Sequence, residues 1–243
     1  MHISTNVVIP MAGLGSRFSK NGFQLPKPLI KINDQAMIIH AIRSLDIPGN
    51  YYFLIRENEF FEETKNILLK EKPDCVILSV QETTEGAAVS ALKFKEYIDN
   101  DNELIITNCD QIMQWNASVT LETLRKFDGG VVTITSCDPK HSYVKINANN
   151  LAEQLVEKQV ISDHALTGIH YWKRGSDFVR SAESMINNND RSANGEFYVA
   201  PTYNYLINEG LKISTVKLAD NEFFPVGTPD DLERYLNESR QIS

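Results

Sequence analysis

Two apolar periodicities alternate through the first half of the chain. Short, mostly apolar runs rich in β-branched residues predict strands at residues 7–10, 52–55, 76–80, 104–107 and 131–135. Between them, apolar residues recur at helical spacing and predict helices at residues 37–45, 60–69, 87–97 and 119–127. Strands that alternate with helices predict an α/β fold with a doubly wound, mostly parallel sheet. Such sheets bind ligands beyond the carboxyl ends of their strands.

The pattern changes after residue 136. Closely spaced strands are predicted at residues 143–146, 155–157 and 166–172, then helices at 177–186 and 203–209, a strand at 212–217 and a helix at 229–236. Residues 187–189, all asparagine, predict a polar loop. No repeat or flexible linker separates the two halves, so we expect one domain over residues 1–243 with a small, β-rich, substrate-side subdomain.

Composition limits the partners of this domain. Asp and Glu (32) outnumber Lys and Arg (24), and the net charge of −8 offers no basic field to nucleic acid or to an anionic membrane surface. The chain is 42% hydrophobic with a mean hydropathy of −0.28, and its longest apolar runs are far shorter than a membrane span. Residues 1–10 lack the basic start and long apolar stretch of a signal peptide, which predicts a cytoplasmic protein.

Cysteine and histidine usage predicts neither disulfides nor zinc. Cys75, Cys109 and Cys137 are too few and too separate for a disulfide framework, so we expect them to be reduced core residues. The five histidines lack the spacing of zinc ligands. Chemistry must therefore be sought in other side chains.

A glycine-rich loop, M-A-G-L-G-S-R-F, follows the first predicted strand, and the segment L-P-K-P-L comes soon after it. Gly13 and Gly15 allow backbone N–H groups to turn inward as an anion-binding nest, and Arg17 and Lys27 add positive charge. A tight strand-to-helix turn also requires glycine, so the two basic residues carry the interpretation of this loop as a phosphate cradle.

Two better-known phosphate loops do not fit this segment. The dinucleotide-binding fingerprint needs a third glycine where Phe18 stands and an acidic residue where Arg56 follows the second strand. The P-loop of ATPases, counted from Gly13, also needs glycine at Phe18. NAD binding and a Walker-type ATPase are therefore disfavoured.

Two further predicted strands end in polar residues. Asp110 follows the strand at 104–107, where a carboxylate can hold Mg²⁺ against nucleotide phosphates or simply cap the next turn. Gln81 and Gly86 follow the strand at 76–80, and an amide near a backbone-exposing glycine can hydrogen-bond the edge of a base. These segments are the second and third candidates for ligand binding.

Seven segments in order resemble the nucleoside triphosphate transferase family, the sugar-phosphate nucleotidyltransferases, over nearly the whole chain. In the first half, residues 12–17 and 26–28 match G-x-G-[ST]-R and its downstream Lys, Gln81 and Gly86 match Q-x-x-x-x-G, and Asp110 falls at the metal position. In the second half, residues 156–158 resemble E-K-P, 165–171 match A-x-T-G-[IL]-x-[YF], 195–197 resemble a G-E segment, and 226–229 hold the terminal G-T. The resemblance implies a nucleotide-diphospho-sugar transferase-like fold, with an NTP-binding half at 1–136 and an acceptor-binding half at 137–243.

The resemblance also implies a role for each matching residue. Arg17 and Lys27 would bind triphosphate, and Asp110 would hold Mg²⁺. The nucleotide would contact Ala12, Gly13, Leu14, Gly15, Gln81 and Gly86, and the acceptor would contact Glu157, Lys158, Thr167, Gly168 and Glu196. Lys158 would bind the phosphate of the acceptor, while the two glutamates would receive its hydroxyls or amines. Simpler roles are an exposed strand pair for Glu157 and Lys158, a packing glycine at 168 and a helix-start carboxylate at Glu196.

The chain departs from the family pattern at two places. Pro225 stands where members carry an aspartate that serves as a second metal ligand, which puts two-metal coordination in doubt. Gln159 replaces the proline of E-K-P, and residues 142–145 read S-Y-V-K instead of the family's small sugar-phosphate contact. The extra tyrosine and lysine favour an acceptor other than an ordinary hexose phosphate.

These observations predict nucleotidyl transfer from an NTP to a phosphorylated small acceptor, with release of pyrophosphate. A pyrimidine is favoured, with CTP narrowly ahead of UTP and dTTP, and the acceptor is a sugar 1-phosphate, amino alcohol phosphate or amino acid phosphate. The short length resembles the enzymes of capsule and surface-polysaccharide pathways. Edge strands of the second half could pair between subunits as a homo-oligomer.

Two alternatives remain open at this point. Pro225 favours a catalytically silent, nucleotide-binding regulator, whereas Arg17, Lys27 and Asp110 argue against it. A glycosyltransferase with a similar sheet would be expected to show D-x-D, but residues 108–110 read N-C-D. Pyrophosphate release distinguishes the three functions.

Overall fold

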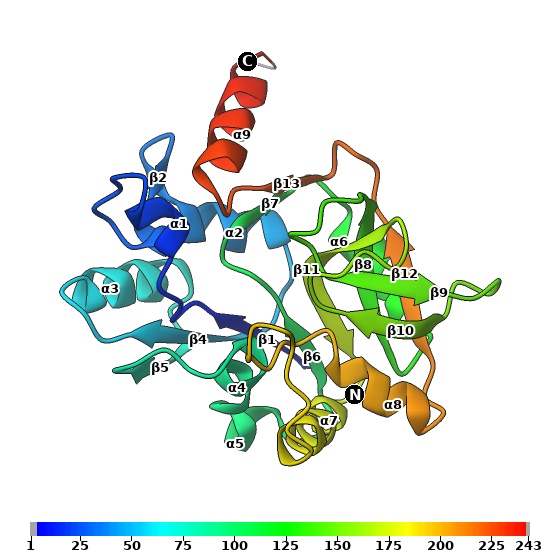
Figure 1. Ribbon diagram of the computed structural model, residues 1–243. Helices are drawn as coiled ribbons and strands as arrows, with labels where there is room; N and C mark the ends of the chain where they lie inside the picture. The colour runs from blue at the N-terminus through cyan, green and yellow to red at the C-terminus, as the bar shows by residue number, and fades with distance from the viewer. Residues whose placement is uncertain (1–3, 242–243) are drawn as a thin grey trace.

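A nine-stranded sheet forms the centre of the protein (Figure 1), whose computed structural model describes residues 4–241. Its strands are β1 (Thr5–Pro10), β4 (Asn50–Arg56), β5 (Val76–Val80), β6 (Glu103–Ile106), β8 (Gly129–Thr135), β9 (Tyr143–Ile146), β10 (Ala152–Val156), β11 (His164–Trp172) and β12 (Ile213–Lys217). The order is β10-β9-β11-β6-β1-β4-β5, and β8 pairs with both β11 and β12. Parallel pairs join β6, β1, β4 and β5, and also β8 and β12, whereas β11 is antiparallel to its neighbours. The predicted, mostly parallel sheet is confirmed, and each of its antiparallel pairs includes a strand of the second half, β9, β10 or β11.

Helices cover both faces of this sheet, as a doubly wound fold requires. They are α1 (Ser16–Ser19), α2 (Met37–Leu45), α3 (Phe61–Glu71), α4 (Ala87–Leu92), α5 (Lys95–Ile98), α6 (Ala117–Leu124), α7 (Gly175–Asn187), α8 (Thr202–Asn208) and α9 (Pro229–Gln241). Figure 1 shows α2 and α3 on one face of the strands β1 and β4, with α4, α5 and α7 on the other. Within residues 4–241, no helix is both long enough and apolar enough to cross a bilayer.

The alternation of side chains along β1 explains why two cores form. Val7 and Ile9 pack into the core beneath α2, α3 and α6, whereas Val8 packs into the core beneath α4, α7 and α8. All three valine and isoleucine side chains are buried, because a parallel strand inside such a fold is covered on both faces. Each core draws residues from both halves of the sequence.

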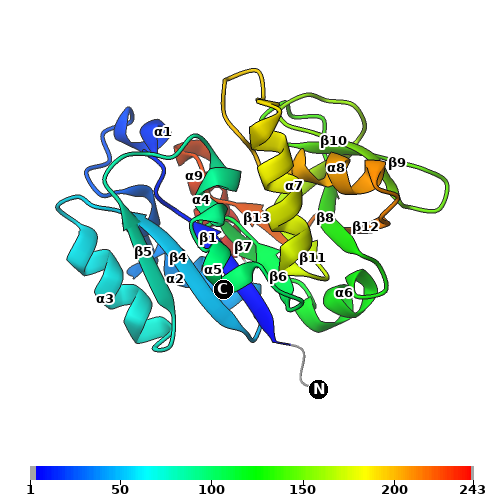
Figure 2. The same cartoon turned by 90° about the horizontal axis from the view of Figure 1, so that it is seen from below.

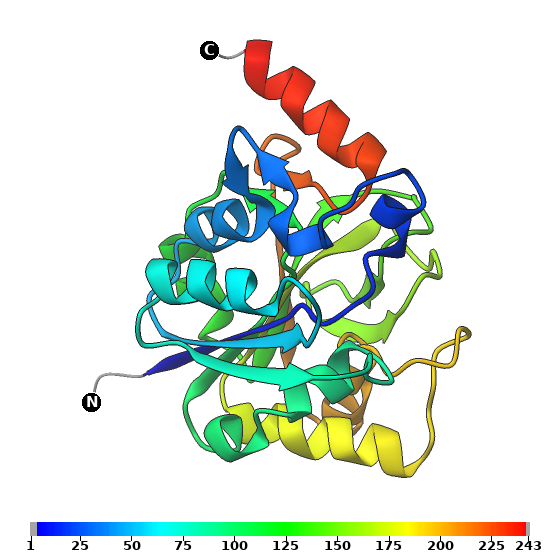
Figure 3. The ribbon, with the colours of Figure 1, turned by 90° about the vertical axis from the view of Figure 1, so that its left-hand side faces the viewer.

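Short elements connect α9 to the first half of the chain. They are a 3-10 helix at Lys27–Leu29 and the strands β2 (Lys31–Ile32), β3 (Gln35–Ala36), β7 (Gln111–Met113) and β13 (Phe223–Pro225). β13 pairs with β7, and a third apolar cluster joins Phe18, Ile32, Met37, Val226 and Leu232. Figure 3 shows α9 lying across this region beside the β2–β3 hairpin. The last helix is thereby packed against the segment that carries the glycine-rich loop.

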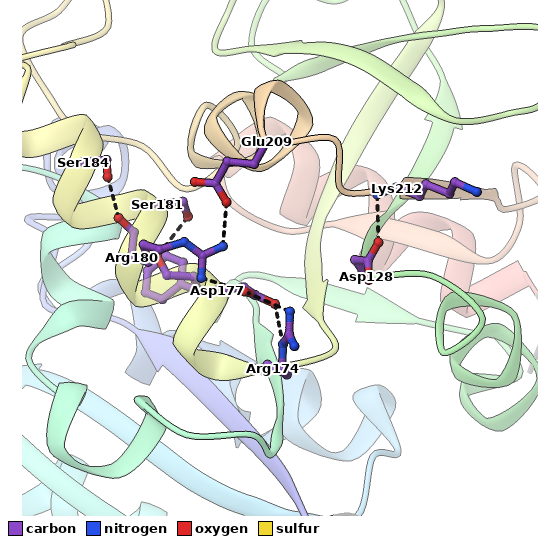
Figure 4. Close-up of polar contacts among 9 residues, drawn as sticks. Asp128, Arg174, Asp177, Arg180, Ser181, Ser184, Glu209 and Lys212 are labelled. Carbon is purple, nitrogen blue, oxygen red and sulfur yellow. Dashed lines mark hydrogen bonds and ion pairs between the residues drawn. The ribbon is translucent and has the colours of Figure 1, made fainter.

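A polar clamp fixes α7 against α8, two helices that lie side by side over the second half (Figure 2). Asp177 is almost fully buried and accepts hydrogen bonds from the guanidinium groups of Arg174 and Arg180 (Figure 4). Arg180 also donates to Glu209 at 2.7 Å, at the end of α8. One arginine therefore ties both helices, because its planar group can serve two carboxylates at once.

The structure corrects several expectations. The helix predicted over residues 87–97 is broken into α4 and α5, because Lys93 and Phe94 donate to carbonyls three residues back and Phe94 turns fully into the core. The sequence did not predict the 3-10 helix at Lys27–Leu29 or the strands β2, β3, β7 and β13, since segments of two or three residues carry no measurable periodicity. Of the cysteines expected in the core, only Cys109 is buried, and Cys137 is exposed.

A buried carboxylate joins three central strands at the edge of the sheet where β6 begins. Glu103 accepts hydrogen bonds from Arg125 through both oxygens, from Thr5 of β1 and from Tyr171 of β11. Burial alone would raise the pKa of Glu103, but these hydrogen bonds outweigh burial and hold the pKa below its usual value. Glu103 is therefore ionised in the fold, and the burial of its charge depends on the guanidinium of Arg125.

We expect Arg125→Met to lower the free energy of unfolding by about 3 kcal/mol, because it leaves the carboxylate of Glu103 buried without a cation. Urea denaturation measures the effect. Lys95→Met is the control, since the pair of Lys95 with Glu183 is exposed on both sides and its loss should leave the midpoint unchanged. Equal midpoints for the two variants would contradict a structural role for Glu103.

Candidate active site

A pocket of about 270 Å³ lies beyond the carboxyl ends of β1 and β6, where Pro10 and Ile106 form part of its wall. Its position is the one expected for ligands of a parallel α/β sheet. The sequence-predicted residues that line it are Arg17, Asp110, Glu157, Thr167 and Gly168. The first two come from the predicted NTP-binding half and the last three from the predicted acceptor half.

An ion pair joins the two predicted triphosphate and metal segments. Lys27 Nζ lies 2.9 Å from Asp110 Oδ2, with side-chain exposures of 26% and 21%. Burial lowers the pKa of Lys27, but the adjacent charge of Asp110 outweighs this and raises the pKa above its usual value, so the ammonium stays charged. Gly227 packs closely against this carboxylate, because a Cβ there would lie 2.3 Å from Asp110 Oδ2 and would displace it.

The glycine-rich loop has one left-handed glycine rather than two. Gly15 has φ 60° and is the N-cap residue of α1. Gly13 has no positive φ, and no atom lies within 4 Å of a Cβ added there. The expectation that both glycines need special backbone freedom is therefore wrong for Gly13. Leu14 is exposed, and Ala12 packs into the core, so only the backbone of Ala12 can face a ligand.

The predicted base-binding residues lie apart from the central pocket. Gln81 is exposed after β5, at the far edge of the sheet, whereas Ala87 at the end of the same loop lines the pocket. Gly86 has φ 128°, and an added Cβ would lie 2.3 Å from the carbonyl oxygen of Phe197. Gly86 is thus required by close backbone packing, whatever it binds.

On the acceptor side, Glu157 and Lys158 are not an exposed strand pair. Both residues follow the end of β10, and the side chain of Glu157 is only 10% exposed. Ser142 donates a short hydrogen bond to Glu157, and burial raises the pKa of this carboxyl. Lys158 Nζ donates to the hydroxyl of Tyr198 at 2.6 Å and lies 3.7 Å from Glu157 Oε1.

The remaining acceptor candidates, Thr167, Gly168 and Glu196, lie in three different surroundings. Thr167 lines the pocket, but its hydroxyl donates to the carbonyl of Val132. Gly168 has φ 90°, a backbone conformation that residues with a Cβ rarely adopt, so the backbone favours glycine here whatever it binds. Glu196 is exposed on a loop, and no helix begins there, since α8 starts at Thr202. The helix-start interpretation of Glu196 is therefore wrong.

Sequence reasoning missed several polar residues of the pocket. Tyr198 lies beside Glu157, and Lys140 pairs with the buried Asp231 of α9 at 2.9 Å. His170 lines the pocket with a pKa lowered to about 3 by burial, so its ring is neutral. Gln111 is buried with no hydrogen-bond partner for Oε1. Of these residues, only Tyr198 could have been suspected from the sequence, because it lies two residues after the motif residue Glu196.

The donor set fits a metal that is carried mainly by phosphates. Among residues 4–241, no three His, Cys, Asp or Glu side chains gather as metal ligands. Of the three acidic residues that line the pocket, Glu157 accepts a hydrogen bond from Ser142 and Asp231 is engaged by Lys140, which leaves Asp110 as the candidate ligand. Pro225, which also lines the pocket, brings no side-chain oxygen. Mg²⁺ in phosphoryl chemistry commonly uses one or two carboxylates and completes its shell with substrate phosphates and water.

The chain is similar to known proteins in both sequence and fold. Residues 6–241 match the profile of the nucleotidyl transferase family. The chain belongs to this family. That assignment confirms the resemblance carried by the sequence motifs and agrees with the largely parallel central sheet.

Among curated relatives, a mannose-1-phosphate guanyltransferase of Debaryomyces hansenii is 29% identical over 164 residues, covering 63% of this chain and 45% of the relative. The chain thus spans about half the length of the curated relatives it matches. A nucleoside-diphosphate-sugar pyrophosphorylase of Vibrio cholerae superposes with a TM-score of 0.81 at 24% identity, covering 95% of this chain and 99% of that one. A putative glucose-1-phosphate thymidylyltransferase of Bacillus anthracis gives 0.77 at 20% identity, with 99% and 97% covered. These structures share the fold of the family.

The two loop glycines should respond differently to substitution. We expect Gly15→Ala to lower the free energy of unfolding by about 1–2 kcal/mol, because alanine is strained at φ 60° and meets Lys27 Cβ at 3.1 Å. Gly13→Ala should change it by less than about 0.5 kcal/mol, since its Cβ points into open space. Thermal unfolding of both variants checks this, and equal losses would contradict the described loop geometry.

Proposed function

We propose that this protein is a nucleotidyltransferase that joins an NTP to a phosphorylated small acceptor and releases pyrophosphate. The observation that carries the proposal is the Lys27–Asp110 pair at the carboxyl edge of β1 and β6, because the carboxylate of this pair lines a pocket together with Arg17 and Glu157. A carboxylate and two cations beside one another suit a polyphosphate with its metal. Family membership supports the same activity.

The chemistry needs no nucleophile from the protein. A phosphate oxygen of the acceptor attacks the α-phosphorus in line, a new P–O bond forms, and the bond to the bridging oxygen breaks so that pyrophosphate leaves with the electron pair. The attacking phosphate is already ionised at neutral pH, so no general base is required. Arg17 and Lys27 stabilise the charge that builds on the phosphates, and the pocket aligns the two substrates.

The proposed metal is Mg²⁺, and Asp110 would hold it. When bound, such an ion neutralises phosphate charge and orients the leaving group. Lys27 would then exchange its contact with Asp110 for one with the phosphates. The expected role of Arg17 is independent of this exchange, because no carboxylate in the described part of the chain pairs with its guanidinium.

The substrates follow from the two sides of the pocket. We assign the nucleotide to residues 1–136 and the acceptor to residues 137–243, with Gln81 and Gly86 beside the base and Lys158 on the acceptor phosphate. CTP remains narrowly favoured over UTP and dTTP, for use in surface-polysaccharide precursor synthesis in the cytoplasm. The curated relative named for mannose 1-phosphate and guanylyl transfer supports a sugar 1-phosphate acceptor and makes GTP a necessary arm of the test.

Pyrophosphate release tests the function directly. CTP, UTP, dTTP and GTP are each paired with mannose 1-phosphate, glucose 1-phosphate, phosphocholine and phosphoserine in the presence of Mg²⁺. We expect turnover with at least one pair, and a fall in kcat of at least about 100-fold in Asp110→Asn, because a neutral amide holds Mg²⁺ poorly. Release from no pair would favour the silent regulator that Pro225 also permits.

Lys158→Ala separates the two substrate sites. Loss of a charge-assisted hydrogen bond, worth about 1.5–3 kcal/mol, should raise the acceptor KM roughly 10- to 100-fold and leave the NTP KM nearly unchanged. Lys145→Ala is the control, because Lys145 is exposed and pairs with Glu153 on the neighbouring strand. A rise in the NTP KM instead would move Lys158 to the triphosphate site, and an effect only in Lys145→Ala would move the acceptor phosphate there.

A further inference from the structure

Tyr198 is the centre of the polar cluster on the acceptor side. Its hydroxyl accepts hydrogen bonds from Lys158 Nζ at 2.6 Å and from Asn194 Nδ2 at 2.8 Å. The ammonium of Lys158 also lies 4.6 Å from the centre of the Tyr198 ring, a cation–π contact. Burial and the neighbouring carboxylate of Glu196 raise the pKa of Tyr198. The hydroxyl thus joins Lys158, which is predicted to contact the acceptor, to Asn194 on the opposite loop.

Without Tyr198, little would define the position of Lys158. The side chain is 41% exposed and lines a second, open cavity of about 700 Å³, whereas Tyr198 lines the central pocket. Glu157 lines both cavities, but its carboxylate is 3.7 Å from Lys158 Nζ, beyond hydrogen-bond distance. Lysine has long, flexible side-chain torsions, so an unheld ammonium would spread into the larger cavity.

Tyr198 is itself held by its neighbour in sequence. The amide of Phe197 donates to the carbonyl of Glu85 at 2.8 Å, and the carbonyl of Phe197 accepts from Ala88 at 3.1 Å. The ring of Phe197 is buried beneath the guanidinium of Arg191, which also pairs with Glu85. The backbone next to Tyr198 is therefore hydrogen-bonded to the residues on both sides of Gly86. These bonds fix the position from which the phenol contacts Lys158.

We propose that Tyr198 is a positioning residue of the acceptor site, whose hydroxyl holds the ammonium of Lys158 beside Glu157 at the wall of the central pocket. The proposal rests on the proposed function, since it gives Lys158 its role on the acceptor phosphate. It assigns Tyr198 no contact with the reacting atoms. The effect of Tyr198 must therefore pass through Lys158, and this dependence can be measured.

A double-mutant cycle measures the dependence. With mannose 1-phosphate or glucose 1-phosphate, whichever turns over, Tyr198→Phe should raise the acceptor KM about 3- to 10-fold and leave the NTP KM and the thermal midpoint nearly unchanged. In the Lys158→Ala background the same change should alter the acceptor KM less than about 2-fold, because the partner is already gone. Tyr205→Phe is the matched control, since its hydroxyl contacts only Asn188 and Asp190 among the described residues.

A second readout needs no substrate. The rate at which an acylating reagent modifies Lys158, followed by mass spectrometry against the exposed Lys145, should rise about 3-fold or more in Tyr198→Phe and stay constant in Tyr205→Phe. Hydrogen bonding to Tyr198 contributes to the raised pKa of Lys158, so its loss yields more free amine at a given pH.

The outcomes separate this inference from the proposed function. Absence of pyrophosphate release in the unmodified protein overturns the function, and the acylation rate still decides whether Tyr198 holds Lys158. Turnover with an unchanged acceptor KM in Tyr198→Phe overturns the inference alone. Equal effects of Tyr198→Phe with and without Lys158 also overturn it, because they would show that Tyr198 acts independently of the lysine.

Discussion

The parallel pairing of β1 with β6 determines where chemistry can occur in this protein. Val8 lies opposite Ile106, and the amide of Thr107 continues the ladder by donating to the carbonyl of Val8. Two segments far apart in sequence therefore leave the sheet at the same edge and in the same direction. Lys27 and Asp110 meet because of this register, and a shift by one residue would turn Asp110 to the other face.

Charge is arranged locally around the pocket, although the chain as a whole is acidic. Of the acidic residues that line the pocket, Asp110 is paired with Lys27 and Asp231 with Lys140. Arg17 alone among these basic residues has no carboxylate in the described part of the chain. A polyanionic ligand can thus be attracted by the exposed guanidinium of Arg17 and can then compete with the carboxylates for Lys27 and Lys140.

Sequence periodicity was sufficient for the main strands and most helices because their apolar residues form runs or repeats over four or more positions. It failed at residues 87–97, where Ala91, Phe94 and Ile98 face the same core on both sides of the break and so preserve a helical pattern. The pairing of β13 with β7 is set by tertiary contact and leaves no local signal.

The motifs located the pocket residues Arg17, Asp110 and Glu157, but they could not reveal what each side chain touches. Gly13 and Gly15 look alike in sequence, and only the structure shows that Gly15 has the left-handed backbone and lies against Lys27. Tyr198 escaped because its importance comes from Lys158, which is 40 residues away in sequence. Contacts at such a separation are products of the fold.

The close packing of Gly86 against Phe197 has a thermodynamic consequence. The loop that contains Gly86 and the segment that carries Tyr198 share backbone hydrogen bonds, and an added Cβ would force them apart. Any ligand that displaces one of them must therefore displace the other. If nucleotide binding changes the affinity for the acceptor through this contact, acceptor binding changes the affinity for the nucleotide by the same factor, because the free energy of coupling belongs to the pair of sites and not to either one.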